Sequence, residues 1–182
     1  SKWAIRRPRI VIGVPSGITQ VEKRAVIDAA TSSGAGDVLL SEEPMAAALG
    51  AGLPIDKPLG NMIVDIGGGT TEVAIISMNA TAYSQSIRVA GDEMDEAILH
   101  HLRRAHGIDV GIFEAERLKM ILGSAIAFDE PRALRVFGRD VSTGFPRQVD
   151  VSDETVRQAL HDPITAIVGA VETALEHISP EF

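Results

Sequence analysis

Residues 65–71 combine an aspartate, three consecutive glycines and two threonines, a set that could bind a phosphate together with a metal ion. Glycine leaves the backbone N–H groups of a turn open to an anion, because no Cβ blocks the approach. Asp65 could hold a hydrated Mg²⁺, which keeps most of its waters and needs only one or two protein carboxylates. The hydroxyls of Thr70 and Thr71 add further polar groups. An ordinary hairpin with a glycine-rich turn is the alternative that this stretch by itself leaves open.

The context of these glycines distinguishes them from the commonest phosphate loops. A Walker loop requires G-x-x-x-x-G-K-[ST] before a helix, and a dinucleotide fold requires G-x-G-x-x-G between a strand and a helix. Here apolar and β-branched runs flank the glycines on both sides, so residues 62–76 are predicted to form a β-hairpin with the glycines at its tip. The GAG stretches at 34–36 and 50–52 lack a third glycine at the right distance and are predicted as helix ends.

The first part of the chain predicts alternating strands and helices. Residues 9–15 form a continuous apolar run of strand length, which suits a strand covered on both faces. A capping box of Thr19 and Glu22 then starts a helix, and residues 37–44 form a second short strand that leads into a helix of small residues. A β-α-β-α series of this kind favours a parallel sheet.

The second part follows a linker rich in proline and glycine at 53–60. After the glycine hairpin, residues 81–90 are predicted as a further strand, and a helix begins at Gly91 with acidic residues that suit the helix dipole. Further predictions are a helix within 113–125, a hairpin made of 133–141 and 145–151, and two final helices. Asp162 is expected to cap the second of these helices, with Pro163 at its first position and an apolar stripe running to Ile178.

Composition limits the classes of protein to which the chain can belong. Its 182 residues are 45% hydrophobic, enough for a core in one domain or two small lobes. The net charge of -8 argues against a nucleic-acid partner, because the one basic cluster, Lys2 with Arg6, Arg7 and Arg9, is short. The absence of cysteine excludes a disulfide framework. Without an apolar run of roughly 18 residues or a signal-peptide pattern, the chain is expected to be soluble and intracellular.

Five stretches of the chain resemble, in order and spacing, the MreB family of bacterial actin homologues. DIGGGTTEVAII is similar to the second phosphate loop of the superfamily that contains actin, sugar kinases and seventy-kilodalton heat-shock ATPases. The other four stretches are VPSGITQVEKRAV, LSEEPMAAALGAGLPI, RVAGDEMDEAI and AERLKMILGSA. The resemblance covers nearly the whole chain. It implies an α/β fold of the actin-like, ribonuclease H-like type, with a mixed sheet flanked by helices and a small outer α+β subdomain.

The same resemblance implies a division into lobes. Residues 1–58 would be the end of the first actin-like lobe, residues 59–125 with 152–182 the core of the second, and residues 126–151 the outer subdomain. The chain opens without Met and enters a strand at once, so we expect that it begins in mid-protein.

Residue roles at the phosphates are also implied by the resemblance. Asp65 would organise the Mg²⁺ shell, and the threonines Thr70 and Thr71 would lie at the β- and γ-phosphates of ATP. The backbones of three glycines would surround the same phosphates: Gly67, Gly68 and Gly69. Glu43 and Thr70 would be the catalytic residues, with Glu43 orienting the attacking water. Without the resemblance, Glu42 and Glu43 would be the solvated start of a helix.

Three more residues are assigned to the nucleoside by the resemblance. Gly91 would let the sugar and phosphate side of the nucleotide approach closely, and Glu116 with Lys119 would grip ribose and adenine. By themselves, Gly91 is a helix start and the other two are an intrahelical ion pair. The five histidines of the chain have no ligand-like companions, and we expect no metal site among them.

The family resemblance implies an ATP-dependent cytoskeletal protein whose filaments direct cell shape and cell-wall synthesis. It would lie in the cytoplasm at the inner membrane face and act with cell-wall elongation and membrane-bound morphogenesis proteins, with membrane contact through parts outside this chain. The first phosphate hairpin and the late adenosine segment of the superfamily are not visible here, so we expect weak or no ATP binding and no turnover by this chain. The alternatives are a plasmid- or organelle-positioning actin, a heat-shock nucleotide-binding domain and a sugar kinase.

Overall fold

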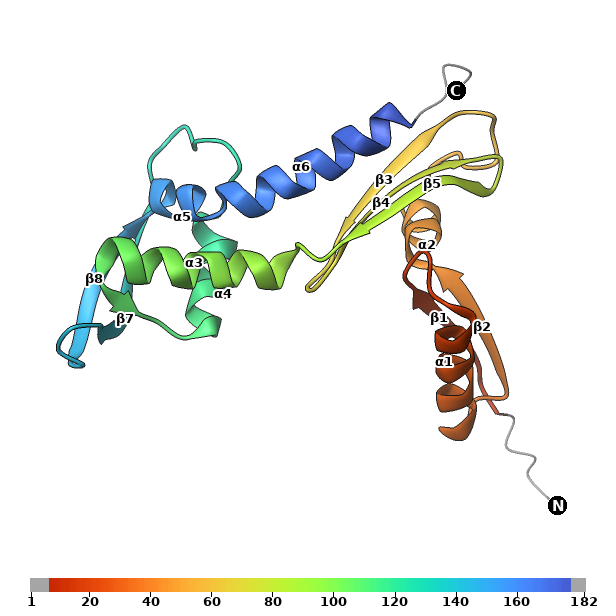
Figure 1. Cartoon of the computed structure of the whole chain (residues 1–182), viewed down its shortest axis with the longest axis horizontal. Helices are drawn as coiled ribbons and strands as arrows, with labels where there is room; N and C mark the ends of the chain where they lie inside the picture. The colour runs from red at the N-terminus through yellow and green to blue at the C-terminus, as the bar shows by residue number, and fades with distance from the viewer. Residues whose placement is uncertain (1–6, 178–182) are drawn as a thin grey trace. The chain divides into compact units, whose positions relative to one another are not determined.

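The computed structural model describes residues 7–177, and its elements are labelled in Figure 1. Lys2 and Arg6 of the basic cluster and Ile178 of the expected last helix lie outside the described residues. Contacts divide the chain into two compact units. The first unit contains Ser1–Asp65, Glu72–Ser86 and Val171–Phe182, and the second contains Ile66–Thr71 and Ile87–Ala170. Each unit is described by itself.

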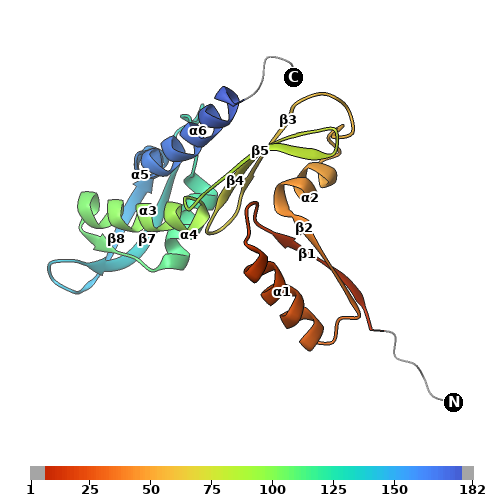
Figure 2. The same ribbon diagram turned by 45° about the vertical axis from the view of Figure 1, so that its right-hand side comes forward.

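The first unit begins with the predicted β-α-β-α series. Strand β1 (Arg9–Val14) pairs in parallel with β2 (Asp37–Glu42), in a register that runs from Arg9 opposite Asp37 to Val14 opposite Glu42. Helix α1 (Gln20–Ser32) connects the two strands and lies beside them in Figure 2. Its capping box is formed as predicted, since Thr19 and Glu22 each bond the other's backbone N–H. Helix α2 (Glu43–Gly50) follows β2 directly.

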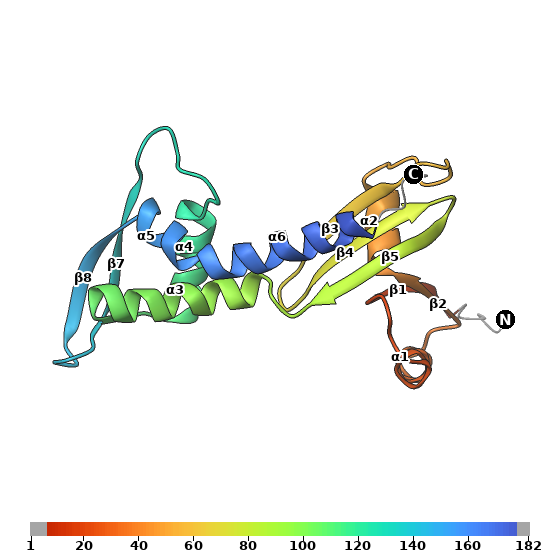
Figure 3. The ribbon, with the colours of Figure 1, turned by 45° about the horizontal axis from the view of Figure 1, so that its top comes forward.

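A three-stranded sheet follows, with the strand order β3-β4-β5 (Figure 3). Its strands are β3 (Asn61–Ile66), β4 (Thr71–Ser77) and β5 (Ala80–Ile87). The central strand β4 is buried along its whole length. Met78 and Asn79 join β4 to β5 with φ values of 51° and 60°, as in the two-residue turns that suit the twist of a hairpin. The core of this unit contains Ala48, Ile55 and Ile76.

The second unit packs helices against a small antiparallel sheet. Its helices are α3 (Gly91–His106), α4 (Ile112–Leu122), α5 (Asp153–Ala159) and the first part of α6 (His161–Glu176). Its sheet has the order β6-β7-β8, made of β6 (Ile108–Asp109), β7 (Ala133–Asp140) and β8 (Pro146–Ser152). Ile98 and Leu102 of α3 are buried in its core together with Leu118 of α4 and Val136 of β7. The predicted helix with acidic residues in its first turn is confirmed, and its apolar face is buried in this core.

The structure differs from the sequence-based expectations at β1 and at the junction of the last two helices. The strand β1 is not covered on both faces within the described residues, because Val11 is 65% exposed. Helices α5 and α6 meet at Leu160, and α6 begins at His161 rather than with Asp162 as its cap. Pro163 is thus the third residue of α6, still in the first turn, where a missing N–H costs no hydrogen bond.

The β7–β8 hairpin, expected as an outer subdomain at 126–151, shares one core with α3, α4 and α5. The compact units thus have other boundaries than the expected lobes, which remain a prediction. Within residues 7–177, no helix is both long enough and apolar enough to span a lipid bilayer.

Candidate functional site

The glycine loop is a short turn between β3 and β4, as the sequence predicts. The N–H of Gly67 donates to the carbonyl of Thr70 at 2.9 Å and closes the turn. All three glycines are exposed, and none has a positive φ. Glycine is therefore not required here by a positive φ. A Cβ on Gly67 would lie 3.2 Å from the carbonyl oxygen of Thr70, whereas the Cβ positions of Gly68 and Gly69 have no atom closer than 3.5 Å. Because the Gly67 amide is used inside the turn, Gly68 and Gly69 carry the amides best placed to meet an anion.

The start of helix α3 holds this loop in place. The N–H of Gly91 donates to the carbonyl of Gly67 at 3.1 Å, and the N–H of Asp92 donates to the carbonyl of Gly68 at 2.8 Å. These bonds satisfy two of the N–H groups that the first turn of a helix leaves unpaired. The acidic run that the sequence assigned to the helix dipole therefore also begins with a residue that binds the loop.

Gly91 has a steric role that the sequence did not predict. A Cβ at this position would lie 3.3 Å from the carbonyl oxygen of Gly67 and 3.3 Å from Nζ of Lys119. The close approach that glycine permits is thus, in this structure, the approach of α3 to the loop. Whether Gly91 also admits the sugar of a nucleotide remains a prediction.

Asp92 is a residue at the loop that sequence reasoning missed. Its carboxylate oxygens lie 3.5 and 3.6 Å from the position of a Cβ on Gly68. A carboxylate beside a phosphate loop repels a bare phosphate and favours one that arrives with a cation, such as Mg-ATP. The signal available in the sequence was its place directly after Gly91, a glycine already selected as a site residue.

Lys119 of α4 is directed to α3 and does not pair with Glu116. Its Nζ donates to the carbonyl of Gly91 at 3.0 Å and lies 2.9 Å from the carboxylate of Asp95. Glu116 is exposed, and the ion pair between residues three apart on this helix joins Arg117 to Glu114 instead. The intrahelical pair of Glu116 and Lys119 is therefore wrong, because the buried Asp95 attracts the ammonium group.

Thr71 does not present its hydroxyl to a ligand. It is fully buried at the start of β4, and its Oγ1 donates to the carbonyl of Val89 at 2.7 Å. Its role in this structure is to tie β4 to the segment before α3. Thr70, at the loop, is only half-buried and remains the threonine that fits the predicted phosphate contact.

The first unit contains the other predicted site residues, Glu43 and Asp65. Glu43 is the first residue of α2, and its pKa is raised by partial burial and then by the negative charges of Glu72 and Asp65. Its neighbour Glu42 is directed elsewhere and accepts a hydrogen bond from Oγ1 of Thr81 at 3.1 Å. Glu43 is therefore not the simply solvated helix start that its sequence context allowed.

The chain connects the two sets of residues covalently, since Asp65 and Glu72 are the residues on either side of the loop segment Ile66–Thr71. Within residues 7–177, no three His, Cys, Asp or Glu side chains form a cluster that could hold a metal ion by themselves. A single aspartate still fits the predicted role in Mg²⁺ binding, because Mg²⁺ takes most of its ligands from water and phosphate.

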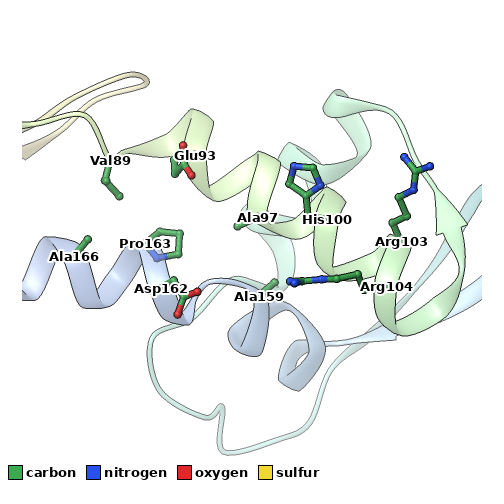
Figure 4. Close-up of a pocket in the computed structure, with 10 residues that line it drawn as sticks. All are labelled: Val89, Glu93, Ala97, His100, Arg103, Arg104, Ala159, Asp162, Pro163 and Ala166. Carbon is green, nitrogen blue, oxygen red and sulfur yellow. The ribbon is translucent and has the colours of Figure 1, made fainter.

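The second unit contains a pocket of about 460 Å³ between α3, α5 and the start of α6 (Figure 4). It is bordered by Glu93, Ala97 and Arg104 of α3 and by Asp162 and Pro163 at the start of α6. None of the predicted site residues lines it. Two of its lining residues, Val89 and Glu93, are sequence neighbours of Gly91, so the pocket borders the start of α3 without including a predicted site residue.

Comparison with known proteins identifies the class of protein. In this mixed α/β chain, the start of helix α3 holds the glycine hairpin by hydrogen bonds. The fold that contains them is actin-like. A crystal structure of MreB5 of Spiroplasma citri bound to ADP has a TM-score of 0.92 and 38% sequence identity, over 95% of this chain and 53% of that chain. The chain belongs to the family described as MreB/Mbl protein, which it matches over residues 1–182.

Curated relatives agree with this assignment. The cell shape-determining protein MreB of Escherichia coli strain K12 is 50% identical over 175 residues, which cover 96% of this chain and 50% of the relative. The cell shape-determining protein Mbl of Bacillus subtilis strain 168 is 40% identical over 181 residues, which cover 100% of this chain and 54% of the relative. The chain therefore spans about half the length of the curated relatives it matches.

Proposed function

We propose that this chain is part of an ATP-dependent bacterial actin-like protein whose filaments direct cell shape and cell-wall synthesis. The observation that carries this proposal is the loop of residues 67–70, held by hydrogen bonds from Gly91 and Asp92 at the start of α3. Two structures of one relative support it, since MreB5 of Spiroplasma citri has been solved with ADP and with AMPPNP. The name of the curated relatives, cell shape-determining protein, supports the cellular role.

In the proposed site, some residues bind the phosphates and another orients the attacking water. Gly68, Gly69 and Thr70 would bind the β- and γ-phosphates, and Asp65 would hold waters of the Mg²⁺ that accompanies ATP. Mg²⁺ supplies charge neutralisation on the phosphates during phosphoryl transfer. Glu43 would accept a proton from the attacking water, and its raised pKa makes it a better base than an ordinary exposed glutamate.

The nucleoside contacts are proposed on the second unit. Gly91 and Lys119 meet at the start of α3, where the carbonyl of Gly91 accepts from Nζ of Lys119. Glu116 is exposed one turn before Lys119 and is available to a ribose hydroxyl. Because Lys119 is already paired with Asp95, we propose that it shapes the adenosine side of the site mainly through Gly91.

Isothermal titration of the full-length protein with Mg-ATP tests the nucleotide part of this proposal. We expect saturable binding, and we expect Asp65→Asn to weaken it while Asp56→Asn, an exposed acid in the preceding linker, does not. For the chain of 182 residues by itself we expect weak or no binding and no turnover. Binding by this chain with micromolar affinity would contradict that last expectation.

Sedimentation tests the filament part. Full-length protein should pellet on ultracentrifugation when ATP is added, because subunits that stack head to tail form an open polymer. No sedimenting polymer under any nucleotide would exclude a filament protein and leave a monomeric ATPase of the same fold. The location at the inner membrane face and the association with cell-wall elongation and membrane-bound morphogenesis proteins are part of the same proposal. Fluorescence microscopy of the tagged full-length protein would test them.

A further inference from the structure

Glu72 places a carboxylate in the buried strand β4, next to the loop in sequence but unassigned by the function proposed above. The residue is 2% exposed. Its Oε2 accepts a hydrogen bond from the backbone N–H of Ser16 at 3.2 Å. Its other oxygen, Oε1, is buried and has no hydrogen-bond partner within residues 7–177. A buried carboxylate oxygen of this kind needs a donor, because burial removes it from bulk water.

Ser16 contributes a second unpartnered atom at the same place. Its Oγ is buried and likewise lacks a partner within the described part of the chain. The hydroxyl can both donate and accept, whereas the carboxylate of Glu72 can only accept when ionised. A water molecule that accepts from Ser16 Oγ and donates to Glu72 Oε1 would satisfy both atoms. Internal waters typically make about three hydrogen bonds, so a third partner is expected.

The side chain of Glu43 lies at the same end of β1 and is our candidate for the third partner. A Cβ on Gly13 would lie 3.2 Å from Cγ and 3.7 Å from Oε1 of Glu43. Glu43 therefore lies against Gly13 of β1, and Gly13 is three residues before Ser16 in the sequence. Glu72 from β4 and Asp65 from β3 are the charged groups that act on it most strongly, whereas Gly13 of β1 and Ser16 in the turn after β1 are uncharged.

We propose that Glu72 is a positioning residue which, with Ser16, holds an internal water that hydrogen-bonds Glu43 and fixes its carboxylate for ATP hydrolysis. This inference rests on the proposed function of Glu43. In that reaction the attacking water forms the new oxygen bond to the γ-phosphorus and gives its proton to Glu43. The bond between the γ-phosphorus and the oxygen bridging to the β-phosphate breaks, and ADP leaves. Glu72 touches none of these atoms and acts through Glu43.

The electrostatic effect of Glu72 has the sign that this role requires. Like charges disfavour the ionised form, so the nearby carboxylate of Glu72 contributes to the raised pKa of Glu43. A base with a pKa closer to the working pH is a better proton acceptor. Replacing Glu72 with glutamine removes this charge and should lower the pKa of Glu43.

A high-resolution crystal structure of the full-length protein tests the water directly, with or without nucleotide. We expect a water within hydrogen-bond distance of Glu72 Oε1 and Ser16 Oγ, and also of the Glu43 carboxylate. Empty density at this point, or Glu72 bonded to another side chain instead, would overturn the inference without any measurement of activity.

Kinetics of the full-length protein test the positioning role. For Glu72→Gln we expect kcat to fall by about ten- to a hundredfold, with Mg-ATP affinity nearly unchanged, because misplacing a reacting group affects the chemical step. The acid limb of the pH profile of kcat should move to lower pH. A merely structural role of Glu72 would not cause this shift. For Ser16→Ala we expect a smaller fall in kcat. Glu42→Gln is the matched control, since Glu42 bonds Thr81 and should leave kcat and the pH profile unchanged.

The outcomes separate this inference from the function on which it rests. If wild-type protein neither binds nor hydrolyses ATP, the proposed function fails. If it hydrolyses ATP and Glu43→Gln abolishes turnover, but Glu72→Gln keeps both kcat and the acid limb, the positioning role alone fails. Should Glu72→Gln not fold, as judged by circular dichroism, Ser16→Ala and the crystallographic water decide, and an unchanged kcat with no water overturns the inference.

Discussion

Lys119 of α4 forms an ion pair with Asp95 of α3, with Nζ 2.9 Å from the carboxylate and the side chains only 21% and 7% exposed. The same Nζ donates to the carbonyl of Gly91, the residue whose own N–H bonds the glycine loop. One lysine thus joins α4 to the start of α3 and, through it, to the loop.

Lys119→Met should destabilise the protein by roughly 3 kcal/mol, because it leaves the carboxylate of Asp95 buried without its partner. Urea denaturation followed by circular dichroism measures this loss. Arg117→Met is the matched control on the same helix: its pair with Glu114 is solvent-exposed, and its removal should cost less than about 1 kcal/mol. Equal losses of unfolding free energy for the two variants would show that the ion pair of Lys119 stabilises the protein no more than the exposed pair of Arg117.

Gly91→Ala should loosen the loop from α3. The added Cβ would lie 3.3 Å from the Gly67 carbonyl, a backbone atom that can move only by shifting the turn. We expect a loss of about 1 kcal/mol, and more for Gly91→Val, as for other overpacked sites. Hydrogen exchange should accelerate at the amides of Gly91 and Asp92. Gly111→Ala is the control, because nothing lies within 4 Å of its Cβ position, and unchanged exchange in Gly91→Val would refute the steric role.

Thr71→Val should destabilise the protein by about 1–3 kcal/mol, since it leaves the carbonyl of Val89 without its hydroxyl donor in a buried place. Thermal unfolding measures the change. Thr71→Ser keeps the hydroxyl and loses only a methyl group, so it should be the milder of the two variants. The reverse order would indicate that Thr71 acts by apolar contact rather than through its hydrogen bond.

Acid should weaken the β7–β8 turn through Asp140. The hydroxyl of Ser142, then the amide of Thr143 and the guanidinium of Arg147, hold the pKa of Asp140 well below its usual range. A carboxylate with a depressed folded-state pKa stabilises the fold above its ordinary pKa of about 3.9, and that stabilisation is lost as pH falls through the folded value.

Asp140→Asn should therefore lower thermal stability at neutral pH, and its difference from wild type should shrink below about pH 3. Melting curves recorded from pH 2 to pH 7 check this dependence. Asp129→Asn, an exposed acid before β7, serves as the control and should follow wild type. A difference that stays constant over the whole range would exclude ionisation of Asp140 as the cause.

Local pattern was sufficient for most of the elements. The strand at β1, the capping box of Thr19 and the acidic first turn of α3 each depend on neighbours within a few positions, and each is confirmed. The sequence places the start of the last helix two residues late, because proline is tolerated anywhere in a first turn and its position does not define the start.

Contacts between distant residues could not be derived in the same way. Lys119 has an acidic residue three positions away, yet it pairs with Asp95, 24 positions away. The sequence shows that Glu116 and Asp95 are both acidic, but it does not show which of the two carboxylates is buried. In the sequence, Glu72 is one polar residue in a predicted hairpin strand, and only the fold shows that it is buried beside Ser16.

The sequence by itself determined the family, the order of strands and helices apart from the two-residue strand β6, and the glycine loop with its flanking Asp65, because these are properties of short stretches of chain. The tertiary structure decided which groups meet: α3 against the loop, Lys119 with Asp95, and Thr71 with Val89 rather than a ligand. The physical reason is that burial sets the energy of polar groups, and burial is a property of the packed chain. In the sequence, a carboxylate such as Glu72 therefore looks like any other acidic residue, and only the folded chain shows that it is buried.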